Sequence, residues 1–182
     1  MARVLVLGGG FGGVSTATEL RKALDDDHEI FLVDRSSTFL MGLRKLWALV
    51  GVGRIEDGSR DLRLLERLGI RFEQREILSV DPEDRSVVTG AETLSADYLV
   101  LALGAESRPD LVSGLAEHGH NVWDVASVPG LKAAVDAFDG GSIVIAIAGM
   151  PYTCPPAPFE CAMLLDDYLR ERGVRAVSYT HL

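Results

Sequence analysis

Residues 149–161, GMPYTCPPAPFEC, hold both cysteines of the chain and four of its seven prolines. Cys154 lies just before an expected helix, whose free N-terminal amides and partial positive charge favour a thiolate. A thiolate is the nucleophilic form of cysteine and can attack a sulfur species. The neighbouring prolines stiffen the turn and hold the side chain still. We therefore expect a reactive cysteine here, with an inert loop residue as the alternative.

Cys161 has a different setting. It is spaced at i, i+3, i+4 and i+7 with Leu164, Leu165 and Tyr168, which is the pattern of a buried helix face. A free cysteine in such a place behaves as a small apolar residue. A disulfide between the two cysteines is the alternative, and spacing alone does not decide it.

A glycine-rich sequence near the N-terminus, VLVLGGGFGGVSTA, fits the spacing Gly-x-Gly-x-x-Gly with Gly8, Gly10 and Gly13. A buried apolar strand, residues 4–7, leads into it, and an apolar helix face follows. Residues 29–34, EIFLVD, are expected to form the second parallel strand and end in an acid. Strand, glycines, helix and acid in this order predict a dinucleotide site of Rossmann type rather than an unliganded glycine turn.

Each part of this motif has a physical role. Gly8 permits a tight turn, Gly10 lets a diphosphate approach the backbone, and Gly13 lets the helix pack closely on the strand. The helix N-terminus supplies free N–H groups. Asp34 accepts hydrogen bonds from an adenosine ribose, and its charge disfavours a 2′-phosphate. The pattern does not separate FAD from NAD. The expected cofactor site also includes Phe11, Gly12 and Arg35.

Further along the chain, the pattern predicts more strands and helices. We expect a helix at 59–69, a strand with a small antiparallel insertion at 70–90, and a buried strand at 97–110. Residues 35–53 are apolar without a clean period, so they either form core, cover a bound flavin or receive an apolar electron acceptor.

The second half of the chain starts another strand–helix unit. A helix at 127–138 with Ser127 as its N-cap precedes the strand GGSIVIAIAG at 140–149. The helix that follows should close at Gly173, with a further strand at 174–178.

The turn after this second strand departs from the glycine pattern. When the Gly-x-Gly-x-x-Gly motif is aligned with its first glycine at Gly149, Pro151 falls at the second glycine position and Cys154 at the third. Proline has no N–H for a phosphate, and its ring obstructs close approach. We therefore expect no standard pyridine-nucleotide site here. Electrons would then enter by another route, for which Cys154 is the candidate.

The expected fold class is α/β, with a Rossmann-like FAD-binding unit that carries a small antiparallel insertion, followed by an incomplete second Rossmann-like unit. The domain boundaries are placed at 1–110 and 111–182. The second unit supplies about two strands, whereas a doubly wound unit needs several, so an open edge would remain. We therefore expect the chain to be the N-terminal part of a longer protein.

Composition excludes several classes of function. The formal net charge is −9, and Lys and Arg do not cluster, so no nucleic-acid partner is expected. Two cysteines do not make a disulfide scaffold, and we expect no metal site. No apolar run approaches the ~18 residues of a membrane span. A strand starts at once where a signal peptide would lie, so we expect a cytoplasmic protein.

Three segments, GGGFGGVSTA, DYLVLALGA and YTCPPAPFE, together resemble the sulfide:quinone oxidoreductase and flavocytochrome c sulfide dehydrogenase flavoproteins. These belong to the two-dinucleotide-domain flavoprotein superfamily. The first segment is generic to the superfamily, and the Cys-Pro-Pro-Ala-Pro-aromatic-Glu run is specific. ALGA resembles the second FAD motif, usually ATG, with Leu103 in place of Thr, and adds Ala102 and Gly104 to the expected FAD contacts. The resemblance covers nearly all of 1–178.

The resemblance implies a bound FAD and two redox cysteines, of which Cys154 matches one. It implies oxidation of a small sulfur substrate, with two electrons passing through FAD to a quinone or a cytochrome. The family's partner cysteine, its C-terminal FAD segment and its membrane-contacting helices have no counterpart in this chain. Since no signal peptide is expected, the resemblance favours the members of the family that pass electrons to a quinone over the exported, cytochrome-linked members. It implies peripheral contact with the cytoplasmic face of the membrane through the membrane-contacting helices that have no counterpart in this chain.

Three alternatives remain open at this point. A type II NADH:quinone dehydrogenase would need a glycine-rich loop near 149–154, and a CoA-disulfide or glutathione-type reductase would need a cysteine after Asp34. A non-catalytic flavin-binding module or redox sensor would use Cys154 to signal and would not turn over.

Overall fold

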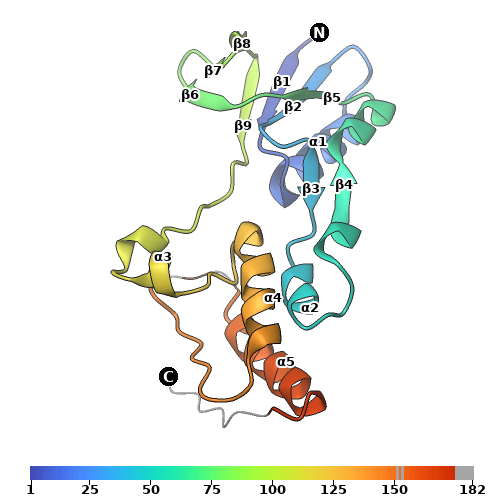
Figure 1. The fold of residues 1–182 in the computed structure, drawn as a ribbon. Helices are drawn as coiled ribbons and strands as arrows, with labels where there is room; N and C mark the ends of the chain where they lie inside the picture. The colour runs from blue at the N-terminus through green and yellow to red at the C-terminus, as the bar shows by residue number, and fades with distance from the viewer. Residues whose placement is uncertain (151, 153, 175–182) are drawn as a thin grey trace. The chain divides into compact units, whose positions relative to one another are not determined.

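The computed structural model describes residues 1–150, 152 and 154–174 of the chain (Figure 1). They fall into two compact units, the first formed by residues 1–41 and 59–106, the second by residues 42–58 together with the chain from Ser107 onward. The expected division at residue 110 cuts the chain once, whereas the structure groups residues 42–58 with the second unit.

The first unit is built on a four-stranded sheet with the strand order β5-β2-β1-β9. The central strand β1 (Arg3–Leu7) pairs in parallel with β2 (Glu29–Asp34) and β9 (Tyr98–Leu101). β2 in turn pairs in parallel with β5 (Arg71–Gln74). Helix α1 (Phe11–Ala23) makes the crossover from β1 to β2. This is the Rossmann-like arrangement that the first motif predicts, and it gathers the carboxyl ends of these strands at one edge.

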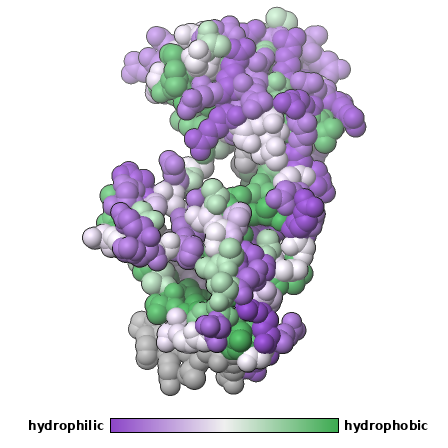
Figure 2. Space-filling view, viewed as in Figure 1, coloured by the Kyte–Doolittle hydropathy of each residue, from purple (hydrophilic) through white to green (hydrophobic). Residues whose placement is uncertain are grey.

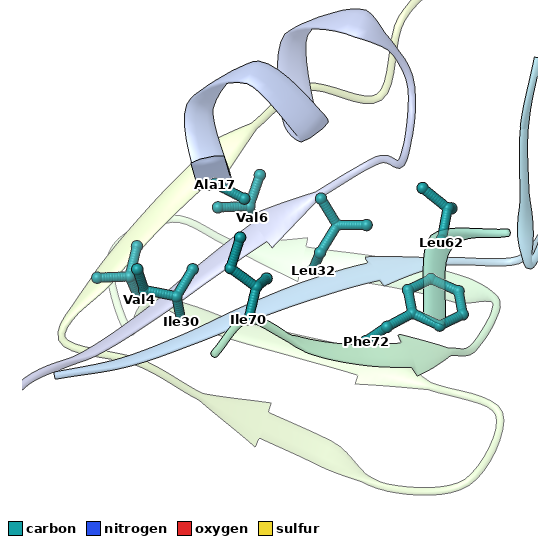
Figure 3. Packing of buried hydrophobic residues seen from close by; sticks show 8 residues of the cluster. All are labelled: Val4, Val6, Ala17, Ile30, Leu32, Leu62, Ile70 and Phe72. Carbon is teal, nitrogen blue, oxygen red and sulfur yellow. The ribbon is translucent and has the colours of Figure 1, made fainter. Parts of the chain in front are cut away.

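Apolar side chains cover both faces of the two central strands, β1 and β2, which is why these strands are nearly continuous apolar runs. The outer strands β5 and β9 are more exposed, so the prediction of a buried strand at 97–110 is confirmed in position, at Tyr98–Leu101, but not in burial. Figure 3 shows the cluster between the sheet and α1, which consists of Val4, Val6, Ala17, Ile30, Leu32, Leu62, Ile70 and Phe72. The alternate residues of the same strands form a second cluster with an antiparallel ladder, made of Leu5, Leu7, Phe31, Val33 and Val87.

That ladder confirms the predicted antiparallel insertion. Its strands are β6 (Ile77–Asp81), β7 (Ser86–Thr89) and β8 (Thr93–Ser95), in the order β6-β7-β8. The turn between β6 and β7 contains Arg85, which has a positive φ of 49°.

The prediction of a helix over 59–69 is wrong in its first part. Residues Ser59–Asp61 form β4, which pairs antiparallel with β3 (Thr38–Leu40). A 3-10 helix follows at Leu62–Leu68. Gly69 ends this helix with a left-handed φ of 77°, which confirms the predicted stop.

The second unit is helical in its described part. Its main helices are α2 (Arg44–Leu49), α4 (Val128–Ala137) and α5 (Ala157–Glu171). They enclose a core of Leu46, Leu49, Val135, Cys161 and Leu165. Shorter elements are the 3-10 turns Ile55–Gly58, Pro109–Leu111 and Val125–Ser127 and the single-turn helix α3 (Leu115–His118).

Two predicted features of this unit are wrong. Residues 140–149 form no strand, because they have no hydrogen-bonded neighbour within the described chain, and Val144 is 84% exposed. The Ser127 side chain does not cap α4; Asp124 instead caps the preceding turn by accepting from the Ala126 N–H at 3.0 Å. The strand expected at 174–178 falls, apart from its first residue, outside the described residues.

The two units differ in surface character. On the face shown in Figure 2, hydrophilic residues predominate over the sheet unit, and hydrophobic residues gather over the helical one. Large exposed apolar side chains of the helical unit include Val144, Met150 and Met163. Among the described residues, no helix has the length and apolarity that crossing a bilayer requires.

Candidate functional site

The glycine-rich turn joins β1 to α1, and two of its glycines are required by the fold itself. Gly8 has a φ of 107°, and a Cβ there would overlap the carbonyl group of Ala102. A Cβ on Gly13 would overlap the carbonyl oxygen of Gly8. Backbone atoms cannot move aside as a flexible side chain can, so both positions exclude any larger residue.

Gly10 is different, because nothing lies within 4 Å of the position that its Cβ would take. It is the N-cap of α1 and has an extended backbone, φ −80° and ψ −166°, that other residues adopt readily. At Gly12 a Cβ would make only an ordinary contact, 3.7 Å from Ala102 Cβ. The fold itself therefore does not require glycine at position 10, whereas a ligand that approaches this backbone would. The open cradle at a helix N-terminus fits the diphosphate of FAD.

Asp34 ties the end of β2 to this turn. Its Oδ2 accepts the N–H of Gly9 at 2.6 Å, and its Oδ1 accepts the N–H of Ser36 at 2.7 Å. A carboxylate has about four acceptor sites. Asp34 therefore orders the turn and keeps acceptor capacity for ribose hydroxyls.

A cleft of about 320 Å³ opens at the carboxyl edge of the sheet. It brings together four residues of the expected site, Gly8, Asp34, Arg35 and Gly104. The remaining lining residues were not assigned to the site from sequence, and they are Val33, Glu76, Ile77, Leu103, Ala105 and Glu106. Most of these follow β5 or β9, and the ends of parallel strands are where open α/β sheets bind ligands. That positional rule could have found them.

The other expected cofactor residues lie outside the lining of this cleft. Phe11 begins α1, is 54% exposed, and meets Phe39 edge-on with ring centroids 5.1 Å apart. Ala102 donates its N–H to the carbonyl oxygen of Leu7 at 2.8 Å, which continues the pairing of β1 with β9 as far as Gly8. Gly10 is the N-cap of α1, and Gly12 and Gly13 lie in the first turn of that helix.

Cys154 belongs to the second unit, is exposed and is not in a disulfide. Its φ is 60°, the left-handed region that costs an L-residue roughly 1–2 kcal/mol. Its carbonyl oxygen accepts the N–H of Ala157 at 3.0 Å where α5 begins. Non-glycine residues held in this region cluster at functional sites. Pro151 lies outside the described residues, so the closure of this turn to a nucleotide stays a prediction.

Cys161 is also free, but it is buried and 4% exposed. Its neighbours are the core residues of α2, α4 and α5, which confirms the predicted buried helix face. Burial, with a smaller contribution from the charge of Glu160, raises the pKa of the Cys161 thiol to about 11. It is therefore an uncharged, apolar thiol near neutral pH. No cluster of potential metal ligands occurs within the described part of the chain.

Comparison with known proteins gives the family. A family model described as pyridine nucleotide-disulphide oxidoreductase matches residues 2–137. A second, for the central part of the sulfide dehydrogenase [flavocytochrome c] flavoprotein chain, matches residues 130–177. The demethylphylloquinone reductase of Synechocystis is 33% identical, covering 94% of this chain and 44% of the relative. An alternative NAD(P)H-ubiquinone oxidoreductase of Arabidopsis thaliana is 30% identical, with coverages of 94% and 37%.

The solved sulfide:quinone oxidoreductase of Aquifex aeolicus is 26% identical, with a TM-score of 0.83, and the match covers 96% of this chain and 41% of that one. The chain thus spans about two-fifths of the length of the proteins it matches. The first family model covers well over half of the chain, and the glycine cradle fits the cofactor of that family. The chain belongs to the pyridine nucleotide-disulphide oxidoreductases, a family of FAD-dependent enzymes.

Proposed function

We propose that this chain is the FAD-binding portion of an oxidoreductase that takes electrons from sulfide or a related sulfur species and passes them to a quinone. The observation that carries the proposal is the match of residues 130–177 to the central part of a sulfide dehydrogenase flavoprotein. That segment contains Cys154, whose exposure and left-handed backbone set it apart from the buried Cys161.

In this proposal the two units have separate tasks. The turn at Gly10 and the carboxylate of Asp34 hold the adenosine diphosphate half of FAD in the first unit. The chemistry that bound FAD supplies is two-electron transfer between a sulfur donor and a quinone. The Sγ of Cys154, in the second unit, is the group that reacts with the small sulfur substrate. The enzyme would work in the cytoplasm, with peripheral contact to the membrane face where its quinone lies.

A second candidate is an NAD(P)H-dependent quinone oxidoreductase. It is favoured by the match to the alternative NAD(P)H-ubiquinone oxidoreductase of Arabidopsis thaliana, which reaches across both units of this chain. Both candidates share FAD and a quinone, and they differ in the electron donor. The donor is therefore what the experiment has to identify.

The test is anaerobic titration of the full-length protein while the absorbance of its flavin is followed. Sulfide should bleach the flavin band, and NADH should not. Rapid bleaching by NADH would overturn the proposal in favour of the second candidate. Bleaching by sulfide without reoxidation by a quinone would favour a redox sensor.

A pair of cysteine variants assigns the entry point of the electrons. Cys154→Ala should keep FAD bound and abolish reduction by sulfide. Cys161→Ala is the matched control, because its thiol is buried in the core and should not take part in electron transfer. Equal rates of sulfide-driven reduction in Cys154→Ala and the unchanged protein would refute the role of Cys154.

A further inference from the structure

The turn that carries Cys154 has few backbone donors of its own. Three of the five residues from Cys154 to Pro158 are prolines, which have no N–H, so only Cys154 and Ala157 have a backbone N–H to donate. The N–H of Ala157 is used on the carbonyl oxygen of Cys154, at 3.0 Å. The backbone therefore supplies little hydrogen bonding to hold the thiol in place.

Cys154 nevertheless has a backbone conformation that its sequence disfavours. Its φ is 60°, in the left-handed region that is costly for an L-residue. The next residue is Pro155, and a proline drives the residue before it toward an extended backbone with negative φ. Such a residue keeps its conformation only where the surrounding contacts hold it. The turn therefore needs a further contact beside the one at Ala157.

The side chain of Tyr152 makes that contact. Its hydroxyl donates to the carbonyl oxygen of Pro155 at 3.4 Å, and so connects the residues on either side of Cys154. Tyr152 is half-buried, whereas Cys154 is exposed. One hydrogen bond from Tyr152 and one from Ala157 therefore bracket the cysteine and leave its thiol exposed.

We infer that Tyr152 is a positioning residue for Cys154, whose hydroxyl holds the turn in the conformation from which the thiol reacts. The inference rests on the proposed function of Cys154. The Tyr152 hydroxyl is bonded to the backbone, and it acts by raising the share of time for which Sγ is correctly placed. Loss of the hydroxyl should therefore lower the rate by the same factor at every sulfide concentration. The limiting rate falls, and the half-saturating sulfide concentration stays the same.

Tyr152→Phe tests this, because it removes the hydroxyl and keeps the ring. FAD-loaded full-length protein is mixed anaerobically with sulfide, and the rate constant of flavin bleaching is measured over a range of sulfide concentrations. The limiting rate should fall at least about threefold, the loss expected for one neutral hydrogen bond, with the half-saturating concentration unchanged. Tyr168→Phe is the matched control and should keep the rate, because its hydroxyl bonds to Asp136 at 2.6 Å toward the C-terminal end of α5.

A stability comparison tests the same hydroxyl without sulfide. Glycine adopts a positive φ more easily than alanine, so Cys154→Gly should have a higher denaturant midpoint than Cys154→Ala while the turn is held. In the Tyr152→Phe background this difference should vanish or reverse, because the turn is free to relax. In the Tyr168→Phe background it should persist.

The two measurements separate failure of this inference from failure of the proposed function. Where Cys154→Ala abolishes reduction by sulfide, an unchanged limiting rate in Tyr152→Phe, or an equal fall in Tyr168→Phe, would overturn the inference and leave the proposed function standing. Where Cys154→Ala keeps that rate, the proposed function fails, and with it the effect of Tyr152 on the reaction. The difference between glycine and alanine then decides whether Tyr152 holds the turn, and its persistence in the Tyr152→Phe background would overturn that as well.

Discussion

The chain has two turns that lead from an apolar segment into a helix, and they do opposite things with side chains. The segment from Gly8 to Gly13 has glycine at every position except Phe11, and it leaves open backbone at Gly10. The turn at Cys154 keeps a thiol exposed in a left-handed conformation that glycine would adopt more easily. Under the proposed function, one local arrangement serves in the first unit to bind a phosphate group and in the second to present a nucleophile.

The two turns also differ in what holds them in place. The Gly8 N–H donates to the carbonyl oxygen of Val33 at 2.8 Å, so the first turn is tied to the neighbouring strand. Residues 140–149, before the second turn, have no sheet neighbour in the described chain. The first turn is tied to the sheet, whereas the hydrogen bond from the Ala157 N–H to the Cys154 carbonyl oxygen, at 3.0 Å, ties Cys154 to the start of α5.

The largest effect is expected from Gly13→Ala, which breaks the first turn. The added Cβ would overlap the carbonyl oxygen of Gly8, and neither backbone segment can yield. We expect the free energy of unfolding to fall by more than about 3 kcal/mol, measured by denaturant titration. Gly12→Ala is the control, because its Cβ would make an ordinary contact at 3.7 Å, and it should stay within about 1 kcal/mol of the unchanged protein. Similar losses at both positions would contradict this account.

The sequence predicted the first unit better than the second, for a physical reason. A Rossmann motif is local, so the strand expected at 29–34 is found at Glu29–Asp34. Strand formation at residues 59–61, in the first unit, and at residues 140–149, in the second, depends on a partner distant in the sequence, which periodicity does not reveal. Glu76 and Glu106 belong to no motif and meet only where strand ends converge in the sheet.

Gly10→Val separates ligand binding from folding in the first turn. The position is open and its backbone is extended, so the variant freed of FAD should lose only about 1 kcal/mol of stability, the cost of valine in place of glycine at the N-cap of α1. Its side chain would occupy the path of the diphosphate, and we expect the affinity for FAD to fall at least about a hundredfold. Fluorescence titration with FAD measures this. Unchanged affinity would mean that the diphosphate does not lie on this turn.

Cys161 sharpens the contrast between the two thiols of the second unit. Its pKa is raised to about 11, so between pH 9 and 11 the unfolded state releases this proton while the folded state keeps it. Stability should therefore fall by about 2 kcal/mol over this range and be unaffected by this group below pH 9. Denaturant titrations at several pH values measure the loss. Cys161→Ala should remove this part of the dependence, and an identical pH profile in the variant would contradict it.

The smallest effect tests whether the second turn is strained. Cys154→Gly should stabilise the protein by about 0.5–1 kcal/mol relative to Cys154→Ala. Glycine adopts a φ of 60° without the steric penalty of a Cβ, and its greater conformational entropy in the unfolded state offsets part of this gain. Arg85→Gly, compared with Arg85→Ala, is the control at a second left-handed residue, φ 49°, which belongs to neither turn. Both pairs should show a gain in the denaturant midpoint. A gain at Arg85 but not at Cys154 would mean that Cys154 does not keep its left-handed backbone in solution. The backbone strain that distinguishes the cysteine turn from the glycine turn would then be absent.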